Sequence, residues 1–421
     1  MYQLQTLKNS LTLITIPMPH LDSVTTYIAV GAGSRYETKR INGVSHFLEH
    51  MFFKGSRKYP TAEIISTLID GIGAVNNAAT SKEYTNYWIK SSAKHLELSM
   101  DIISSMIKEP LFQEEEIERE KGVIIEEIRM RRDNPSIHIW DLYEMLQFDK
   151  NQPFGFDTAG EEKIITSLKR EDFIEYVDSL YSPKNMVLVL AGKLPNNVNK
   201  LVEKYFLDLP ERSSHKSTPY KKPRQNKPKI AVAFRKNDQA NLVLGMESYD
   251  RYNPKKYAAL VLGTILGSGM SSRLFIQVRE RRGLAYGVSA GSDFYIDTGA
   301  FSVFAGLKLE KVEEGLQVII AELERCVTEK VTVEELKKAK EMSRGRLALS
   351  MESTNYLAGT FGLMYVLDRK IETPEEYLEK IDKVTLEDVQ EVAKEIFQKS
   401  KFVLQVMGPF KSKDKFDKIL R

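Results

Sequence analysis

The sequence predicts an α+β fold made of two homologous α/β-sandwich domains, each an antiparallel-rich sheet covered by helices. Residues 165–192 match residues 381–408 with a constant offset of 216 and no gap. Both stretches show helical periodicity followed by an apolar strand, and neither half alternates strictly between strands and helices. Such a match indicates an internal duplication. The identical pairs include Ile165/Ile381, Glu175/Glu391, Leu188/Leu404 and Gly192/Gly408.

The two copies are separated by residues 213–228, which are rich in Lys, Pro, Ser and Asn. This composition is typical of a solvated linker. Its basic side chains could also contact a partner, but a connector is the simpler interpretation. We therefore predict an N-terminal domain over residues 1–212 and a homologous C-terminal domain over residues 229–421.

Composition narrows the class of protein. The chain has 421 residues, 42% hydrophobic and 28% charged, as expected for a globular protein with a sizeable core. Its 61 basic and 58 acidic residues give a net charge of +3, so composition makes no case for a nucleic-acid partner. Cys326 is the only cysteine, which excludes internal disulfides and cysteine-bound zinc and fits a reducing compartment.

Neither a targeting segment nor a membrane segment is predicted. Residues 1–8 lack the charged-then-apolar pattern of a signal peptide, and no apolar run approaches 18 residues. We expect no membrane span and a cytoplasmic location, although export without a leader would leave no trace in the sequence.

The first half begins with two stretches of alternating apolar and polar residues, as strands would show. The Gly31-Ala-Gly33 turn that follows resembles a phosphate loop, but it lacks the third glycine and any Gly-Lys-Ser/Thr, so we interpret it as a plain loop. Helical periodicity appears later and breaks at Pro110. The expected elements are strands over 11–17 and 23–30, a helix over 61–70, one extended strand over 76–88 and helices within 96–132.

A possible metal site lies in the motif His46-Phe-Leu-Glu49-His50. On a helix, residues four apart share a face, so both histidines would project side by side with Glu49 next to them. Two neutral imidazoles can hold one zinc ion and leave room for a third ligand and a water. An amphipathic helix with two chance histidines is the alternative interpretation. All six histidines lie at or before His215, so the second half cannot repeat such a site.

A third ligand would have to come from a neighbouring element. The highly charged helix predicted around residues 114–132 carries Glu120 and Glu127, which are seven apart and share nearly one face. A run of glutamates on a helix is usually a solvated face. The need for a third ligand is what makes Glu127 a candidate, with Glu126 as the alternative.

Taken together, these residues resemble the pitrilysin/insulinase family of zinc metallopeptidases, in particular its short-chain branch of bacterial processing proteases and the mitochondrial processing peptidase. The resemblance covers nearly the whole chain. Several of the motifs follow one another in the family's order. They are Val30–Arg35, His46–His50, Asn77-Ala with Thr80–Thr85, Glu120–Glu127, Met270–Phe275 and Arg282–Tyr286.

The resemblance implies one zinc ion per chain, held by His46, His50 and Glu127. It implies Glu49 as the general base for a zinc-bound water and Glu120 as a carboxylate that orients a ligand. The family's spacing of six residues between the two glutamates selects Glu127 over Glu126.

The resemblance also implies a substrate-binding edge strand and an Arg/Tyr pair. The strand would pair with the substrate backbone through Asn77, Ala78, Ala79 and Thr80, although an ordinary edge strand is the alternative. Arg279 and Tyr286 would contact the substrate near the scissile bond and stabilise a developing oxyanion.

The implied function is a zinc-dependent endopeptidase that cleaves peptides or unfolded segments inside a closed chamber formed by a homodimer. Two alternatives are a non-catalytic structural subunit and an active subunit that needs a distinct inactive partner. No expected catalytic residue is missing, which argues against the first. The presence of both Arg279 and Tyr286 argues against the second.

Overall fold

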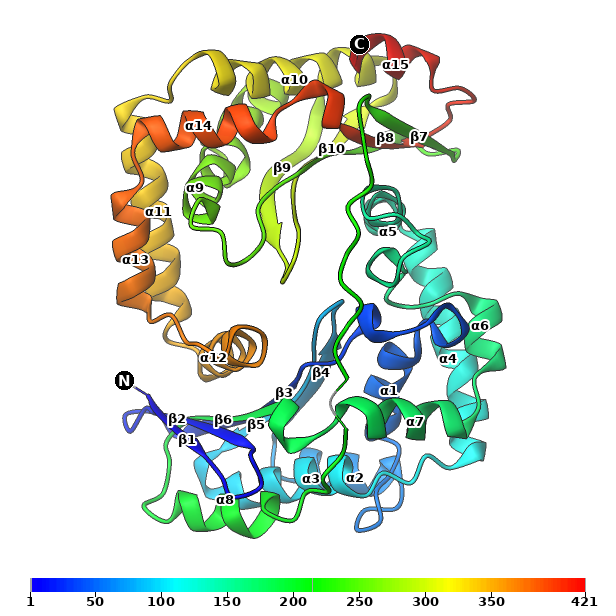
Figure 1. The fold of residues 1–421 in the computed structure, drawn as a ribbon, viewed down its shortest axis with the longest axis vertical. Helices are drawn as coiled ribbons and strands as arrows, with labels where there is room; N and C mark the ends of the chain where they lie inside the picture. Colours follow the sequence, from blue (N-terminus) through cyan, green and yellow to red (C-terminus); the bar gives the residue numbers. More distant parts are fainter. Residues whose placement is uncertain (1, 214, 421) are drawn as a thin grey trace. The chain divides into compact units, whose positions relative to one another are not determined.

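The computed structural model describes residues 2–213 and 215–420, and the chain divides into two compact units. Each unit contains one β-sheet and its covering helices (Figure 1). The first unit comprises Met1–Arg129, Phe156–Thr218 and Ala348–Glu372, and the second comprises Met130–Gly155, Pro219–Leu347 and Thr373–Arg421.

The sheet of the first unit has six strands in the order β1-β2-β6-β3-β5-β4, so β4 is an edge strand. All pairings are antiparallel except that of β2 with β6. The strands are β1 (Gln3–Thr6), β2 (Thr12–Pro17), β3 (Ser23–Val30), β4 (Val75–Thr80), β5 (Thr85–Ser92) and β6 (Met186–Gly192).

Both faces of this sheet are buried, which explains the uninterrupted apolar run of β6. Leu188 and Leu190 face one core, whereas Val187 and Val189 face another on the opposite side. Helices including α1 and α3 cover the first face, and α12 covers the second (Figure 1). The helices are α1 (Val44–Phe52), α2 (Ala62–Gly71), α3 (Leu96–Lys108), α4 (Glu114–Asp133), α6 (Glu162–Ser167), α7 (Arg170–Leu180), α8 (Val198–Phe206) and α12 (Thr354–Asp368).

The sheet of the second unit repeats this plan in the order β7-β11-β8-β10-β9. Again one pairing among the described strands is parallel, here that of the edge strand β7 with β11. The strands are β7 (Lys229–Phe234), β8 (Gln239–Glu247), β9 (Ala285–Phe294), β10 (Gly299–Lys308) and β11 (Val403–Gly408). The helices are α5 (Pro135–Gln147), α9 (Lys256–Gly267), α10 (Val312–Thr328), α11 (Val333–Ser350), α13 (Pro374–Lys383), α14 (Leu386–Ile396) and α15 (Asp414–Leu420).

The duplication inferred from the sequence is present in the fold. Helix α7 and helix α14 begin and end at positions that differ by the same 216 residues as the sequence match. The strands that follow them, β6 and β11, occupy equivalent places in the two sheets. The predicted α+β fold of two homologous sandwich domains is therefore confirmed.

The two halves exchange one helix each, which the sequence did not indicate. Helix α5 belongs to the second unit, where Ile139 and Tyr143 pack against Val243 of β8. A side chain at Gly245 would collide with the Tyr143 ring, so glycine is required for this approach. Helix α12 belongs to the first unit. The compact units thus differ from the predicted division into 1–212 and 229–421, because burial depends on spatial proximity rather than on chain order.

One element was predicted wrongly. The stretch 76–88, expected to be one extended strand, is a hairpin in which β4 and β5 pair antiparallel around a turn at residues 81–84. The break in the long helical region is confirmed, since α3 ends before Pro110 and α4 begins after it. Within the described part of the chain, no helix has the length and apolar character needed to cross a membrane.

Candidate metal centre

Helix α1 places the histidine motif at the surface of the first unit's core. Its Phe47, Leu48 and Met51 are buried in that core, whereas His46 and His50 lie on the partly exposed side of the helix. The helical spacing therefore separates a buried packing face from a partly exposed face that carries both histidines, as the sequence predicted.

The start of helix α1 is fixed by Glu37, a buried carboxylate that the sequence did not identify. It accepts hydrogen bonds from the backbone N–H groups of Gly43 and Ser45 at 2.8 and 2.9 Å, from the Ser45 hydroxyl at 2.5 Å and from the Asn42 amide at 2.9 Å. Burial raises the pKa of Glu37, although these hydrogen bonds oppose the shift. Gly43 has a φ of +94°, which suits glycine. The contacts satisfy donors at the helix N-terminus and fix its direction.

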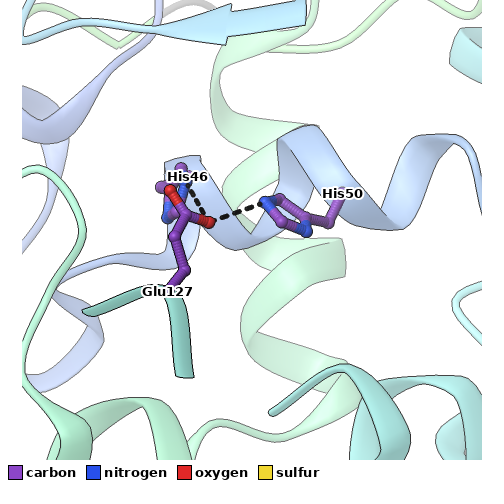
Figure 2. Close-up of side chains that lie close together, drawn as sticks. All are labelled: His46, His50 and Glu127. Carbon is purple, nitrogen blue, oxygen red and sulfur yellow. Dashed lines mark ion pairs between the residues drawn. The ribbon is translucent and has the colours of Figure 1, made fainter. Parts of the chain in front are cut away.

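Helix α4 brings Glu127 to the two histidines (Figure 2). One carboxylate oxygen, Oε2, lies 3.5 Å from Nε2 of His46 and 3.5 Å from Nε2 of His50. The two imidazole rings are 5.1 Å apart between centroids. All three candidate ligand atoms lie within 4.8 Å of one another.

These distances fit a metal ion. Zinc bound at about 2.1 Å from each ligand in a tetrahedron would separate neighbouring ligand atoms by roughly 3.4 Å. The observed separations of 3.5 Å match that value and exceed an ordinary hydrogen bond. Two histidines and one glutamate also form a donor set typical of catalytic zinc, with a position left open for water or substrate.

The electrostatics of the centre favour a cation. Burial disfavours the imidazolium form of His50, but the neighbouring carboxylates of Glu120 and Glu127 outweigh this effect and raise its pKa to about 9. The contacts with His46 and His50 hold the pKa of Glu127 well below its ordinary value, against the effect of burial. A divalent ion can replace that proton, because both carboxylates remain ionised beside it.

Glu120 contacts the ring nitrogen of His50 that does not face Glu127. Its Oε1 lies 2.9 Å from Nδ1 of His50, and the residue is only 3% exposed. Metal-binding histidines characteristically donate their second ring N–H to such a carboxylate, which fixes the tautomer and the ring orientation. The structure therefore places Glu120 in contact with the ring that it is predicted to orient.

The two remaining candidates of this region are placed differently. Glu49 is partly buried next to the histidines, and no hydrogen bond or ion pair of its carboxylate occurs among the described residues. Glu126 points away, because its carboxylate pairs with Arg129 at 2.7 Å and its side chain is 72% exposed. The structure thus brings Glu127, and not Glu126, to the histidines.

The predicted substrate strand is an edge. Asn77, Ala78, Ala79 and Thr80 all lie on β4, next to helix α1. The hairpin turn that follows is held by a buried ion pair between Arg35 and Glu83, whose side chains are 1% and 3% exposed. An edge strand held rigidly beside the histidines can receive an extended peptide.

Arg279 and Tyr286 lie together in the second unit. The Arg279 guanidinium is 5.3 Å from the centre of the Tyr286 ring and 4.7 Å from that of Phe275. Residues Phe275–Glu280 form a π-helix, a rare geometry that often occurs at functional sites. Tyr286 is 79% exposed, so its phenol is accessible.

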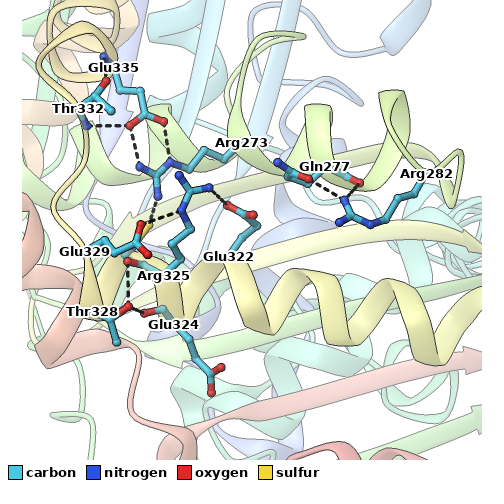
Figure 3. Close-up of polar contacts among 11 residues, drawn as sticks. Arg273, Gln277, Arg282, Glu322, Glu324, Arg325, Thr328, Glu329, Thr332 and Glu335 are labelled. Atoms are coloured by element: carbon cyan, nitrogen blue, oxygen red, sulfur yellow. Dashed lines mark hydrogen bonds and ion pairs between the residues drawn. The ribbon is translucent and has the colours of Figure 1, made fainter.

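The segment that carries Arg279 is held at both ends (Figure 3). Before it, Arg273 forms a bidentate pair with Glu335 at 2.6 and 2.7 Å and approaches the buried Cys326 at 3.5 Å. After it, Arg282 bonds back to Gln277 at 2.6 and 2.9 Å. These contacts restrict the backbone on either side of the π-helix.

Three features of these sites were missed in the sequence. The phenyl ring of Phe275 lies four residues before Arg279, and helical spacing could have indicated that contact. Glu37 gave no signal, because its contacts depend on how the loop before helix α1 folds back on the helix N-terminus. Another missed contact, that of Lys54 with Glu120, is taken up below.

The fold and the His–His–Glu cluster define a metallopeptidase-like protein with an inverted His-x-x-Glu-His helix. Residues 13–152 match the model of the insulinase family (peptidase family M16), and residues 167–343 match that of the peptidase M16 inactive domain. An uncharacterized zinc protease of Bacillus subtilis is 34% identical over 96% of this chain and 97% of its own. Another from Streptomyces coelicolor is 33% identical over 97% and 90%. The chain belongs to the insulinase family, as the sequence motifs predicted.

Solved structures show the same fold. A protease from Helicobacter pylori superposes with a TM-score of 0.91 at 23% identity, covering 97% of this chain and 99% of that one. A peptidase M16 inactive domain protein from Pseudomonas fluorescens gives 0.88 at 20% identity, covering 97% and 98%.

Proposed function

We propose that the protein is a zinc-dependent endopeptidase that cleaves peptides or unfolded segments. The observation that carries the proposal is the convergence of His46, His50 and Glu127 at metal-binding distances. Family membership and the names of the relatives as zinc proteases support it.

His46, His50 and Glu127 would hold the zinc ion. Bound zinc would polarise the scissile carbonyl and lower the pKa of the attacking water toward about 7. Glu49 accepts the proton of that water and returns it to the leaving amine. Two observations support this role: Glu49 lies between the two histidines on helix α1, and its carboxylate has no hydrogen-bond or ion-pair partner among the described residues.

The remaining residues position the substrate. The edge of β4 binds the extended peptide backbone through residues 77–80, which suits substrates of varied sequence because backbone pairing ignores side chains. Arg279 and Tyr286 donate hydrogen bonds to the substrate near the cleaved bond and stabilise the oxyanion. Access through a closed chamber would restrict substrates to peptides and unfolded segments.

The test is cleavage of a peptide library by the purified protein, with and without a chelator. We expect internal cleavage that chelation abolishes and that added zinc restores, because the proposed chemistry requires the metal. Mass spectrometry of the products identifies the sites cut. Cleavage that survives verified removal of the metal would contradict the proposal, as would no cleavage by the zinc-loaded protein.

We further propose a homodimer in which Arg279 and Tyr286 of the partner subunit complete each zinc site. The first half of the chain has the His–His–Glu cluster, and the second half has the Arg/Tyr pair but no histidine. Twofold symmetry would then give two shared sites per dimer.

Mixing two inactive variants tests this arrangement. Glu49→Gln and Arg279→Ala homodimers should each be nearly inactive. After subunit exchange, mixed dimers should contain one doubly damaged site and one intact site, so activity should recover to about a quarter of wild type. Steady-state peptidase rates report the recovery, and native mass spectrometry verifies the exchange. If Arg279 served its own chain, every site would stay damaged and no activity would return.

A further inference from the structure

We infer that Lys54 is a positioning residue for the metal centre, acting through Glu120 on His50. The inference rests on the proposed zinc site. It adds Lys54, a residue outside the family motifs that indicated the site. Nζ of Lys54 lies 2.6 Å from Oε2 of Glu120, while the other oxygen, Oε1, lies 2.9 Å from Nδ1 of His50. Glu120 thus bridges the ammonium group and the imidazole with its two oxygens.

Burial makes this contact different from a surface ion pair. The Glu120 side chain is 4% exposed and that of Lys54 is 27% exposed. Exposed pairs contribute little to stability because water screens them. A buried carboxylate that loses its cation is destabilised much more strongly, and it then turns toward solvent.

Such a movement of the Glu120 carboxylate would disturb His50. The imidazole can offer Nε2 to a metal only if its proton resides on Nδ1, and an ionised Glu120 accepts that proton's hydrogen bond. Lys54 holds one oxygen of the Glu120 carboxylate, which keeps the other oxygen within hydrogen-bonding distance of Nδ1 of His50.

The two histidines differ in the surroundings of their Nδ1 atoms. Nδ1 of His46 is buried and has no hydrogen-bond partner among the described residues. Of the two histidines, only His50 has a carboxylate, that of Glu120, at its Nδ1 among the described residues. The orientation of the candidate ligand pair therefore depends more on the Lys54–Glu120–His50 chain than on any contact of His46.

The backbone connects Lys54 to the helix that carries Glu120. Lys54 N–H bonds to the Met51 carbonyl at 3.1 Å, which continues the last turn of helix α1. The next residue, Gly55, accepts from the N–H of Leu111 at 3.2 Å, just before helix α4 begins. The segment after helix α1 is thus joined by a backbone hydrogen bond to the segment that leads into helix α4, next to Lys54.

Zinc affinity of Lys54→Met, Lys54→Arg and Lys58→Met, measured by competition with a chromogenic chelator, tests the inference. Lys58 is a matched control, because it lies on the same connection and pairs with Asp101, away from the metal cluster. We expect Lys54→Met to weaken zinc binding about tenfold, at the lower end of the range for residues that orient ligands. Lys54→Arg should restore most of the affinity because it retains a cation, and Lys58→Met should leave it unchanged.

A double substitution separates positioning from general loosening of the fold. In a Glu120→Gln background, Lys54→Met should change zinc affinity by less than about twofold, since Lys54 would have no carboxylate left to hold. An additive tenfold loss there, an equal loss in Lys58→Met, or no loss in Lys54→Met would overturn the inference. A parent protein that binds zinc while Lys54→Met binds it equally well refutes the inference alone. A parent that binds none refutes the proposed function as well.

Discussion

Glu49→Gln should leave the fold and the bound zinc intact while lowering the peptidase rate by about 10²–10⁴-fold. Glu49 lies between His46 and His50 on helix α1, and its carboxylate makes no hydrogen bond or ion pair with the described residues, so the isosteric amide should fit without new strain. An amide cannot accept the proton of the attacking water, so the loss should appear in kcat. Steady-state kinetics and elemental analysis of the same preparation measure both properties.

Glu126→Gln is the matched control for this experiment. It makes the same chemical change on an exposed glutamate that points away from the histidines and pairs with Arg129. We expect it to retain full activity and full zinc content. Near-normal turnover of Glu49→Gln with zinc bound would exclude Glu49 as the general base, whatever the control shows.

His50→Ala should abolish zinc retention. The substitution removes one of three converging ligand atoms and also the contact that Glu120 makes with the centre. Two remaining ligands, His46 and Glu127, are too few to hold zinc against purification, since stable sites use three or four. Elemental analysis of both purified proteins should show about one zinc per chain in the parent, as expected for a single site, and none in the variant.

Glu126→Ala decides whether this effect is specific. It alters the residue next to Glu127 without touching the histidines, so zinc content should stay at the parental level. Circular dichroism of both variants checks that secondary structure survives. Equal loss of metal in the two variants, or a parent without metal, would refute the assignment of the ligands.

The sequence by itself determined the repeated domain and the histidine helix. The gapless match at an offset of 216 located α7 with β6 and α14 with β11, because helical and strand periodicities are local properties of the chain. The spacing of four between His46 and His50 set their common face for the same reason. These signals need no knowledge of which distant segments meet.

Choosing between Glu126 and Glu127 required tertiary structure. The two residues are neighbours in sequence, and rotation of helix α4 against helix α1 decides which one faces the histidines. The family's spacing of six residues had already favoured Glu127. Helical geometry alone left both open, because the 100° step between them cannot be placed without the packing partner.

Tertiary structure alone also decided the hairpin at β4 and β5, the exchange of α5 and α12 and the contacts of Glu37 and Lys54. Each depends on contacts between residues far apart in the chain or on how a loop folds back. The exchange buries an apolar face of α5 on the sheet of the second unit and an apolar face of α12 on the sheet of the first unit. The strands of these sheets are far from the two helices in the sequence. Buried hydrogen bonds such as those of Glu37 and Glu120 form only after the backbone has placed donor and acceptor together. Local periodicity therefore specified the elements and the motif, whereas packing specified which side chains complete the metal centre.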